Sequence, residues 1–177
     1  MDEPHSFMGR RARSTAERPA RGSASREELL GAPSGDLVRR LGRNAEVIAA
    51  LVAGLGEEEA RWRPAPTQWS ALEVVNHLAD EEVEDFRTRL DFTLHRQGEP
   101  WPPIDPQGWV TDREYRARSP GESLERFLAA RRESLAWLDG LVAPDWSLGY
   151  EHPSAGRLTA GDLLTSWVAH DHIHIRQ

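Results

Sequence analysis

The sequence predicts an all-α domain, a four-helix bundle with a long connection between its second and third helices. The twelve prolines of the 177-residue chain leave four long windows without a helix breaker. Each window carries apolar residues at spacings of three and four, and the alternation typical of strands is missing almost everywhere. A chain of this length with 38% hydrophobic residues has the size of one domain around one core. The windows are 34–63, 67–99, 121–143 and 154–177.

The first window predicts an amphipathic helix with one inward-facing polar residue, Asn44. Its apolar stripe follows the helical period and ends at Gly54 and Gly56. We interpret Asn44 as a core polar group that has a hydrogen-bond partner. The stripe consists of Leu37, Leu41, Ile48, Leu51 and Leu55.

The second window predicts a helix that starts at Ser70. Ser70 and Glu73 have the spacing of a capping box, in which each side chain satisfies the backbone N–H of the other residue. The core stripe of this helix is predicted as Leu72, Val75, Ala79, Val83, Phe86 and Leu90.

The third window predicts a helix with Ser119 at its N-cap and Pro120 at its first position. Arg131 falls on its inward stripe, where a guanidinium needs a carboxylate or a bound anion, and we favour a structural ion pair over a substrate contact. The apolar residues of the stripe are Leu124, Phe127, Leu128, Leu135, Leu138 and Val142. The fourth window predicts a helix that starts at Thr159-Ala160-Gly161-Asp162 and continues through Leu163, Leu164, Trp167 and Val168.

The connection at 96–119 is longer than a bundle turn requires, and Trp101 and Trp109 make it apolar enough to pack on the bundle. It is either a lid over an opening or a strap across the bundle, and we favour the strap.

Charge and composition exclude several classes of function. The formal net charge of -7 argues against general binding to nucleic acid. The chain has no apolar run long enough to cross a membrane and no secretory signal, so we expect a cytoplasmic protein. Residues 1–33 are Arg-rich and predict a disordered leader, which leaves 34–177 as the folded domain. Because there is no cysteine, a bound metal must be held by His, Asp or Glu.

A histidine pair lies on the last predicted helix. At about 100° per residue, His170 and His174 fall within about 20° of the stripe position Leu163, whereas His172 points about 180° away and should be exposed. This is the spacing by which one helix presents two imidazoles to one metal ion. Two exposed histidines, or two that hydrogen-bond in the core, give the same spacing. His77 on the second helix lies about 140° from its stripe, so helical geometry alone predicts a surface position.

Two stretches of the chain together resemble the DinB-like family over about residues 35–177. The first is 62–70 (WRPAPTQWS) with Glu73 and His77, and the second is 158–164 (LTAGDLL) with Trp167, His170, Asp171, His174 and Gln177. Members of that family are four-helix bundles with a three-histidine metal site. The resemblance therefore implies that His77, His170 and His174 hold a divalent metal ion.

Three imidazoles without a fourth protein ligand leave positions for water or substrate, which is typical of a catalytic site. Imidazole suits several divalent metals, and zinc or nickel is the expectation here. Each ligating ring needs an acceptor for its other N–H, and the candidates are Glu73, Asp80, Glu81 and Asp171. We also expect the site to open to solvent beside the 96–119 connection.

The resemblance implies a metal-dependent enzyme, either a hydrolase or a transferase that uses a low-molecular-weight thiol. No motif identifies catalytic residues beyond the metal ligands. The alternatives are a non-catalytic metal-binding or stress-response protein and a helical interaction module without metal. The expected partner is a small-molecule substrate, with neither nucleic acid nor membrane. The sequence leaves the oligomeric state open. A homodimer is one option because helical bundles often pair, although the sequence indicates no surface for the dimer contact.

Overall fold

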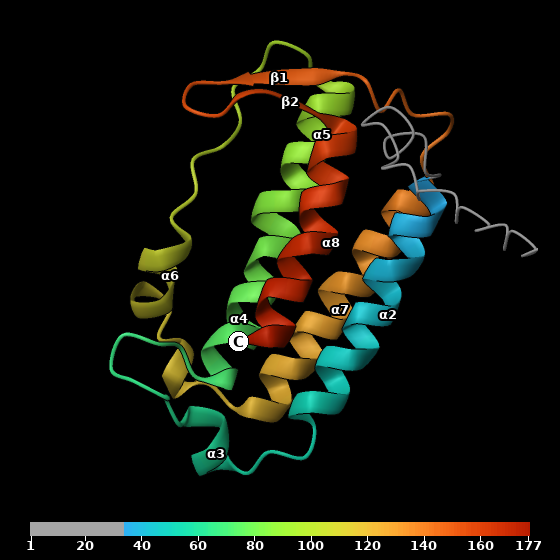
Figure 1. The fold of residues 1–177 in the computed structure, drawn as a ribbon. Coiled ribbons are helices and arrows are strands. Elements are labelled where there is room, and N and C mark those ends of the chain that lie inside the picture. Colours follow the sequence, from blue (N-terminus) through green and yellow to red (C-terminus); the bar gives the residue numbers. More distant parts are fainter. Residues whose placement is uncertain (1–33) are drawn as a thin grey trace, which may run out of the picture.

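The computed structural model describes residues 34–177, and the leader predicted at 1–33 lies outside the described residues. Four long helical segments run side by side (Figure 1). They are α2 (Ser34–Val52), the continuous stretch of α4, η1 and α5, then α7 (Pro120–Asp139) and α8 (Ala160–Arg176). α2 packs on α7 and α8, α4 packs on α7, and α5 packs on α8. The predicted all-α four-helix bundle is confirmed.

Three of these helices start where the sequence predicts. The backbone N–H of Ser70 donates to Glu73 Oε2 (2.8 Å), and the backbone N–H of Glu73 donates to Ser70 Oγ (3.3 Å), which completes the capping box of α4. Thr159 and Asp162 form the same reciprocal pair at the start of α8. Ser119 accepts a backbone N–H at the start of α7. Local capping chemistry therefore sets these starts.

The second long helix contains a π-helical segment that the sequence did not reveal. It consists of α4 (Ala71–Asp80), the π-helix η1 (Glu81–Phe86) and α5 (Arg87–His95). The i→i+5 hydrogen bonds of a π-helix break the 3.6-residue period. Val83, predicted in the core, is therefore 38% exposed, whereas Phe86 and Leu90 are buried as predicted. The acidic residues Glu82 and Asp85 are buried instead.

The prediction of a core position is also wrong for two other residues, Val142 and Leu51. Val142, the last residue of the predicted stripe, is 93% exposed because α7 already ends at Asp139. Leu51 is 54% exposed in the last turn of α2, where the neighbouring helices no longer cover it.

The connections carry short elements of their own. The 53–69 connection contains α3 (Glu57–Arg61), and the 96–119 connection contains α6 (Pro106–Asp112) and the 3₁₀ turn η2 (Tyr115–Ala117). A hairpin of β1 (Gly149–His152) and β2 (Gly156–Thr159) precedes α8, with Gly149 opposite Thr159. The hairpin departs from the expectation of a chain almost without strands.

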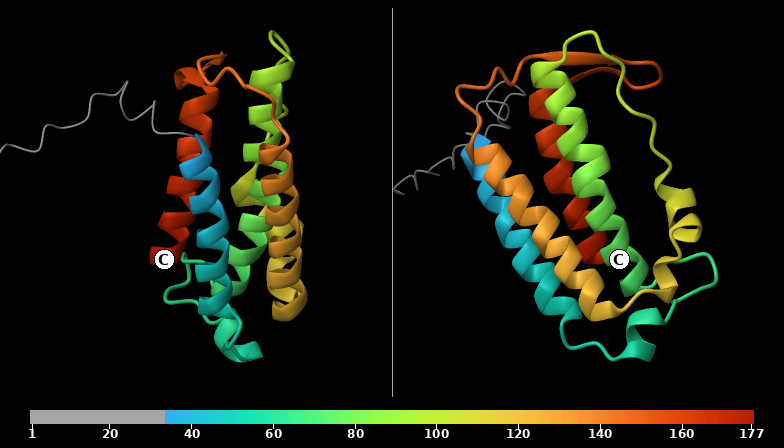
Figure 2. Two further views of the ribbon diagram at one scale, coloured as in Figure 1. Left: turned by 90° about the vertical axis from the view of Figure 1, so that its right-hand side faces the viewer. Right: turned by 180° about the vertical axis from the view of Figure 1, so that it is seen from behind.

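The 96–119 connection is a strap that runs along the second long helix, as Figure 1 and Figure 2 show. At one end Trp101 stacks on Tyr150 of the hairpin, with ring centroids 4.1 Å apart. Nearer its other end, Tyr115 and Arg113 both bind the buried carboxylate of Asp80 on α4. The interpretation as a strap agrees with these contacts.

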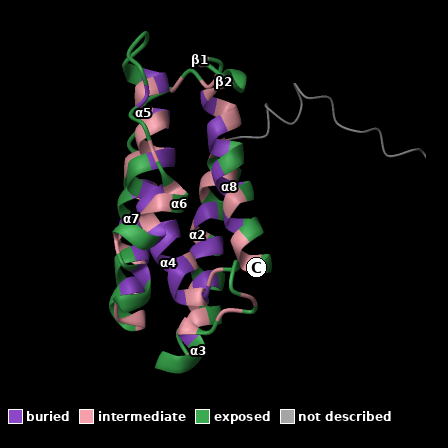
Figure 3. Ribbon diagram, turned by 90° about the vertical axis from the view of Figure 1, so that its left-hand side faces the viewer, coloured by how far each residue is buried: buried purple, intermediate pink, exposed green. Residues whose placement is uncertain are grey.

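α4 is the most enclosed of the helices. It contacts α3, α6, η2 and α7, and buried residues follow one another along it without the exposed face of an ordinary surface helix (Figure 3). Its side chains are therefore buried whichever way they point. Within residues 34–177, no helix combines the length and the apolar character that crossing a bilayer requires.

Candidate metal centre

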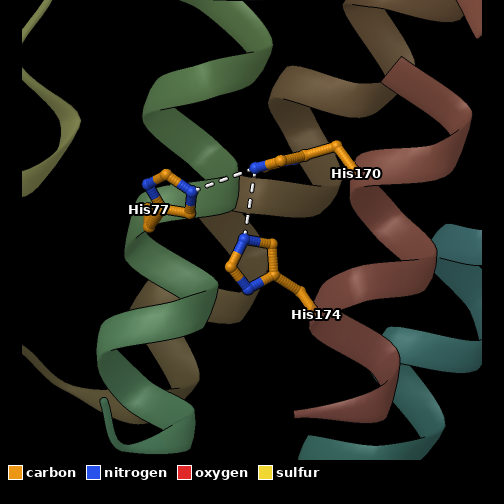
Figure 4. Close-up of side chains that lie close together, drawn as sticks. All are labelled: His77, His170 and His174. Carbon is orange, nitrogen blue, oxygen red and sulfur yellow. Dashed lines mark hydrogen bonds between the residues drawn. The ribbon is translucent and has the colours of Figure 1, made fainter. Parts of the chain in front are cut away.

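Three histidine rings meet between α4 and α8 (Figure 4). His170 Nε2 lies 3.2 Å from His77 Nε2 and 3.2 Å from His174 Nε2. One ring nitrogen from each residue lies within 4.8 Å of the others, which is a spacing that allows all three to bind one ion. The structure thus brings together the three predicted ligands, and their role as ligands stays a prediction.

α8 supplies two of the rings from one face. His170 and His174 are one turn apart and half-buried, whereas His172 between them is exposed, as predicted. The Nε2 atom of His172 lies 3.3 Å from Asn44 Oδ1 on α2 and takes no part in the cluster. The 3.6-residue period was therefore sufficient to place all three histidines of α8.

The third ring comes from α4, where helical geometry alone predicted the surface. His77 is 4% exposed. The prediction from geometry is wrong because α4 is covered on several sides, so a position away from its apolar stripe is also buried. Only the resemblance of the flanking residues to a known family indicated this histidine.

The environment keeps the three rings neutral. Burial, followed by the charges of the other two histidines, lowers the pKa of His77 to about 3. Burial and the charge of His174 lower the pKa of His170 to about 4, and burial also lowers the pKa of His174. Neutral imidazole is the form that binds a metal ion, so at neutral pH the cluster offers three free lone pairs. These residues therefore fit a divalent ion.

The same shifts predict how stability without metal depends on pH. Between pH 6.5 and about 4, the unfolded chain protonates His77 and His170 while the folded chain does not. The free energy of unfolding should therefore fall as the pH falls, by about 1.4 kcal/mol per pH unit for each such histidine. Urea unfolding of the metal-free protein at several pH values measures this slope.

Replacing His170 with Gln should reduce the slope, because the lowered pKa of His170 contributes to it. Equal slopes for the wild type and the His170→Gln variant would contradict the assignment of a lowered pKa to His170.

Aromatic rings and an apolar cavity surround the cluster. The Trp69 ring lies 4.9 Å from the ring of His77, and the Phe86 ring lies 5.1 Å from that of His170. A cavity of about 300 Å³ adjoins His174. Its walls come from α2, the 53–69 connection, α4 and the end of α8, and they include Leu51, Trp62, Trp69, Val74 and Leu78.

No residue of the 96–119 connection lines this cavity. The expectation that the site opens beside that connection is therefore wrong for the cavity at His174, which lies beside the 53–69 connection. The strap is held instead by Asp80, whose carboxylate Tyr115 and Arg113 bind on α4. The sequence could not show which of two long connections the packing places next to the histidines.

Comparison with known families identifies the chain. A family model described as the DinB superfamily matches residues 40–177. The chain belongs to the DinB superfamily. The comparison with curated proteins found no match.

A solved structure supports the fold of this DinB superfamily protein. The chain is similar in structure to YfiT from Bacillus subtilis, which is described as a probable metal-dependent hydrolase with an unusual four-helix bundle topology. The two share 22% sequence identity with a TM-score of 0.72, over 90% of this chain and 88% of YfiT. At this identity the similarity establishes the fold.

Of the four carboxylates predicted to support the ligands of the DinB superfamily site, three have other partners. Glu73 binds Arg63 and Ser70, Asp80 binds Arg113, Tyr115 and Arg126, and Asp171 binds Arg131 and Asn44. Only Glu81 approaches a ligand ring, with Oε1 3.9 Å from His77 Nδ1. Burial and then the neighbouring Asp85 raise the pKa of Glu81 to about 9.

One acceptor was not predicted. Gln177 Oε1 lies 2.9 Å from His174 Nδ1, at the i, i+3 spacing that makes residues neighbours on a helix. That spacing was visible in the sequence and could have indicated this partner. The contact fixes the ring of His174 so that Nε2 faces the cluster.

A buried ionic network holds α8 in place beside the histidines. Arg131 of α7 is 1% exposed and donates to both carboxylate oxygens of Asp171, at 2.9 and 2.8 Å. It also pairs with Glu82 of η1 at 2.5 Å, and Trp167 Nε1 donates to Glu82 at 2.7 Å. Asn44 donates to Asp171 at 3.0 Å. The predictions of an ion pair for Arg131 and a satisfied Asn44 agree with the structure.

Proposed function

We propose that this DinB superfamily protein is a metal-dependent hydrolase whose three histidines hold one divalent ion, either zinc or nickel. One observation carries the proposal: among residues 34–177, the group able to hold an ion consists of three neutral imidazoles and no carboxylate. Three protein ligands leave open positions, as in catalytic sites, whereas structural sites are filled by four.

The chain's own residues would hold the ion and limit access to it. Bound there, the ion would supply Lewis acidity to a water molecule or to a carbonyl group of the substrate. Trp69 and Phe86 cover two of the histidine rings, and the cavity at His174 offers apolar walls to the unreactive part of a small organic substrate. The description of YfiT as a probable metal-dependent hydrolase supports the same class of reaction.

Transfer to or from a low-molecular-weight thiol is the alternative reaction at the same site. A zinc or nickel ion on imidazoles also accepts a thiolate. The chain has no cysteine, so the thiol would have to be a second small molecule.

The test starts from untagged full-length protein and determines its metal content by elemental analysis. Metal-free protein is then assayed against a panel of ester, amide and epoxide probes, with and without added zinc or nickel. Hydrolysis that needs the ion and disappears in the His170→Ala variant supports the proposal. A reaction that needs an added thiol supports the transferase instead. Protein that binds neither ion overturns both.

A further inference from the structure

A ladder of polar side chains leads away from the histidine cluster along the second long helix. His77, Glu81, Asp85 and Arg89 recur every four residues, and the interactions between successive members show that they share one face. His77 Nδ1 lies 3.9 Å from Glu81 Oε1, and Arg89 Nε lies 2.6 Å from Asp85 Oδ1. The Arg89 guanidinium lies over the ring of Trp101 in the strap, 5.0 Å from its centroid.

The first step of this ladder is incomplete. Nε2 of His77 faces the other two histidines, so Nδ1 points away from the cluster and must carry the proton when Nε2 binds an ion. His77 Nδ1 and Glu81 Oε1 are both buried without a hydrogen-bond partner. A separation of 3.9 Å is too long for a hydrogen bond, but it is short enough for a small movement of either side chain to form one.

We propose that Glu81 is the positioning residue of the metal centre, and that it accepts a hydrogen bond from His77 Nδ1–H when the site is occupied. An acceptor oxygen behind a ligating imidazole selects the tautomer with Nε2 free and fixes the direction of the ring. The inference rests on the proposed metal site but not on the reaction performed there.

Asp85, Arg89 and Trp101 keep Glu81 in place. Asp85 interacts with Glu81 on one side and pairs with Arg89 on the other. Both acids are buried, at 4% and 6% exposed, so Glu81 cannot turn to solvent. Glu81 also opens the π-helix η1, and such segments are frequent at functional sites. The structure therefore places a buried acid directly behind a ligand, at one of the four carboxylates that the sequence offered as acceptors.

The test compares Glu81→Leu, which removes the acceptor, with Glu81→Gln, which keeps an acceptor oxygen. Loss of such a partner weakens metal binding about 10- to 100-fold in known sites, so the dissociation constant for zinc should rise by that factor in Glu81→Leu and much less in Glu81→Gln. Glu84→Leu is the matched control, because Glu84 lies in the same segment, is exposed and faces away towards Arg113. Its dissociation constant should equal that of the wild type.

A second readout separates positioning from general stability. In zinc-loaded wild type, nitrogen NMR of the imidazoles should show His77 protonated at Nδ1, with that proton protected from exchange. In Glu81→Leu the proton should exchange faster. Since the wild-type spectrum alone checks the hydrogen bond, the proposal stays testable if a variant does not fold.

An unprotected His77 Nδ1–H in the wild type, or an unchanged zinc dissociation constant in folded Glu81→Leu, overturns the role of Glu81. Failure of the metal site itself has a different signature, in which His77→Ala and His170→Ala bind zinc as the wild type does.

Discussion

Replacing His170 with Ala is expected to weaken zinc or nickel binding by more than about 100-fold, because loss of a direct ligand exceeds the 10- to 100-fold cost of losing an outer partner. His170 is the central ring, since its Nε2 lies 3.2 Å from both other Nε2 atoms. Competition with a chromophoric chelator measures the dissociation constant, and circular dichroism checks the fold.

The control is His172→Ala on the same helix. His172 is exposed and outside the cluster, so its removal should leave the metal affinity unchanged. A large loss of affinity in His172→Ala, together with wild-type affinity in His170→Ala, would show that the ring assignment on α8 is wrong.

The second large effect is expected from Arg131→Met, which leaves Glu82 and Asp171 as buried carboxylates without their cation. Breaking a buried ion pair by removing one partner costs about 3–5 kcal/mol. The free energy of unfolding from urea denaturation should fall by that amount. Because Asp171 adjoins His170 in the sequence, the variant should also bind metal less tightly.

Arg132→Met provides the comparison, since Arg132 is the next residue of α7 and is exposed. Surface substitutions of this kind usually change stability by less than about 0.5 kcal/mol. If both arginine variants unfold at the same urea concentration as the wild type, the buried network contributes nothing to stability.

Two of the three histidines of the metal centre could be placed from the residues of one helix. His170 and His174 share a face because they are four residues apart, and His172 is exposed because it lies halfway round. His77 could not be placed in this way, since its burial comes from the segments that cover α4. Its assignment depended on the resemblance of 62–78 to a family of known architecture.

The break in the second helix shows a related limit. The predicted stripe from Leu72 to Leu90 assumes a single helical period, but the π-helix η1 changes that period, exposes Val83 and buries Glu81. A cluster of acids in a helix normally indicates a solvent-exposed face. Here Arg131 of α7 and Arg89 of α5 pair with the acids Glu82 and Asp85 and make their burial tolerable.

The sequence by itself determined the four helices, three of their starts and the direction of each histidine on α8. Those features depend on capping groups and side chains within about four residues of one another, where the backbone geometry is fixed. The tertiary structure alone decided that His77 is buried, that Arg131 reaches Asp171, and that the cavity at His174 lies beside the 53–69 connection. These outcomes depend on packing between segments far apart in the chain, and the helical period carries no information about which surfaces meet.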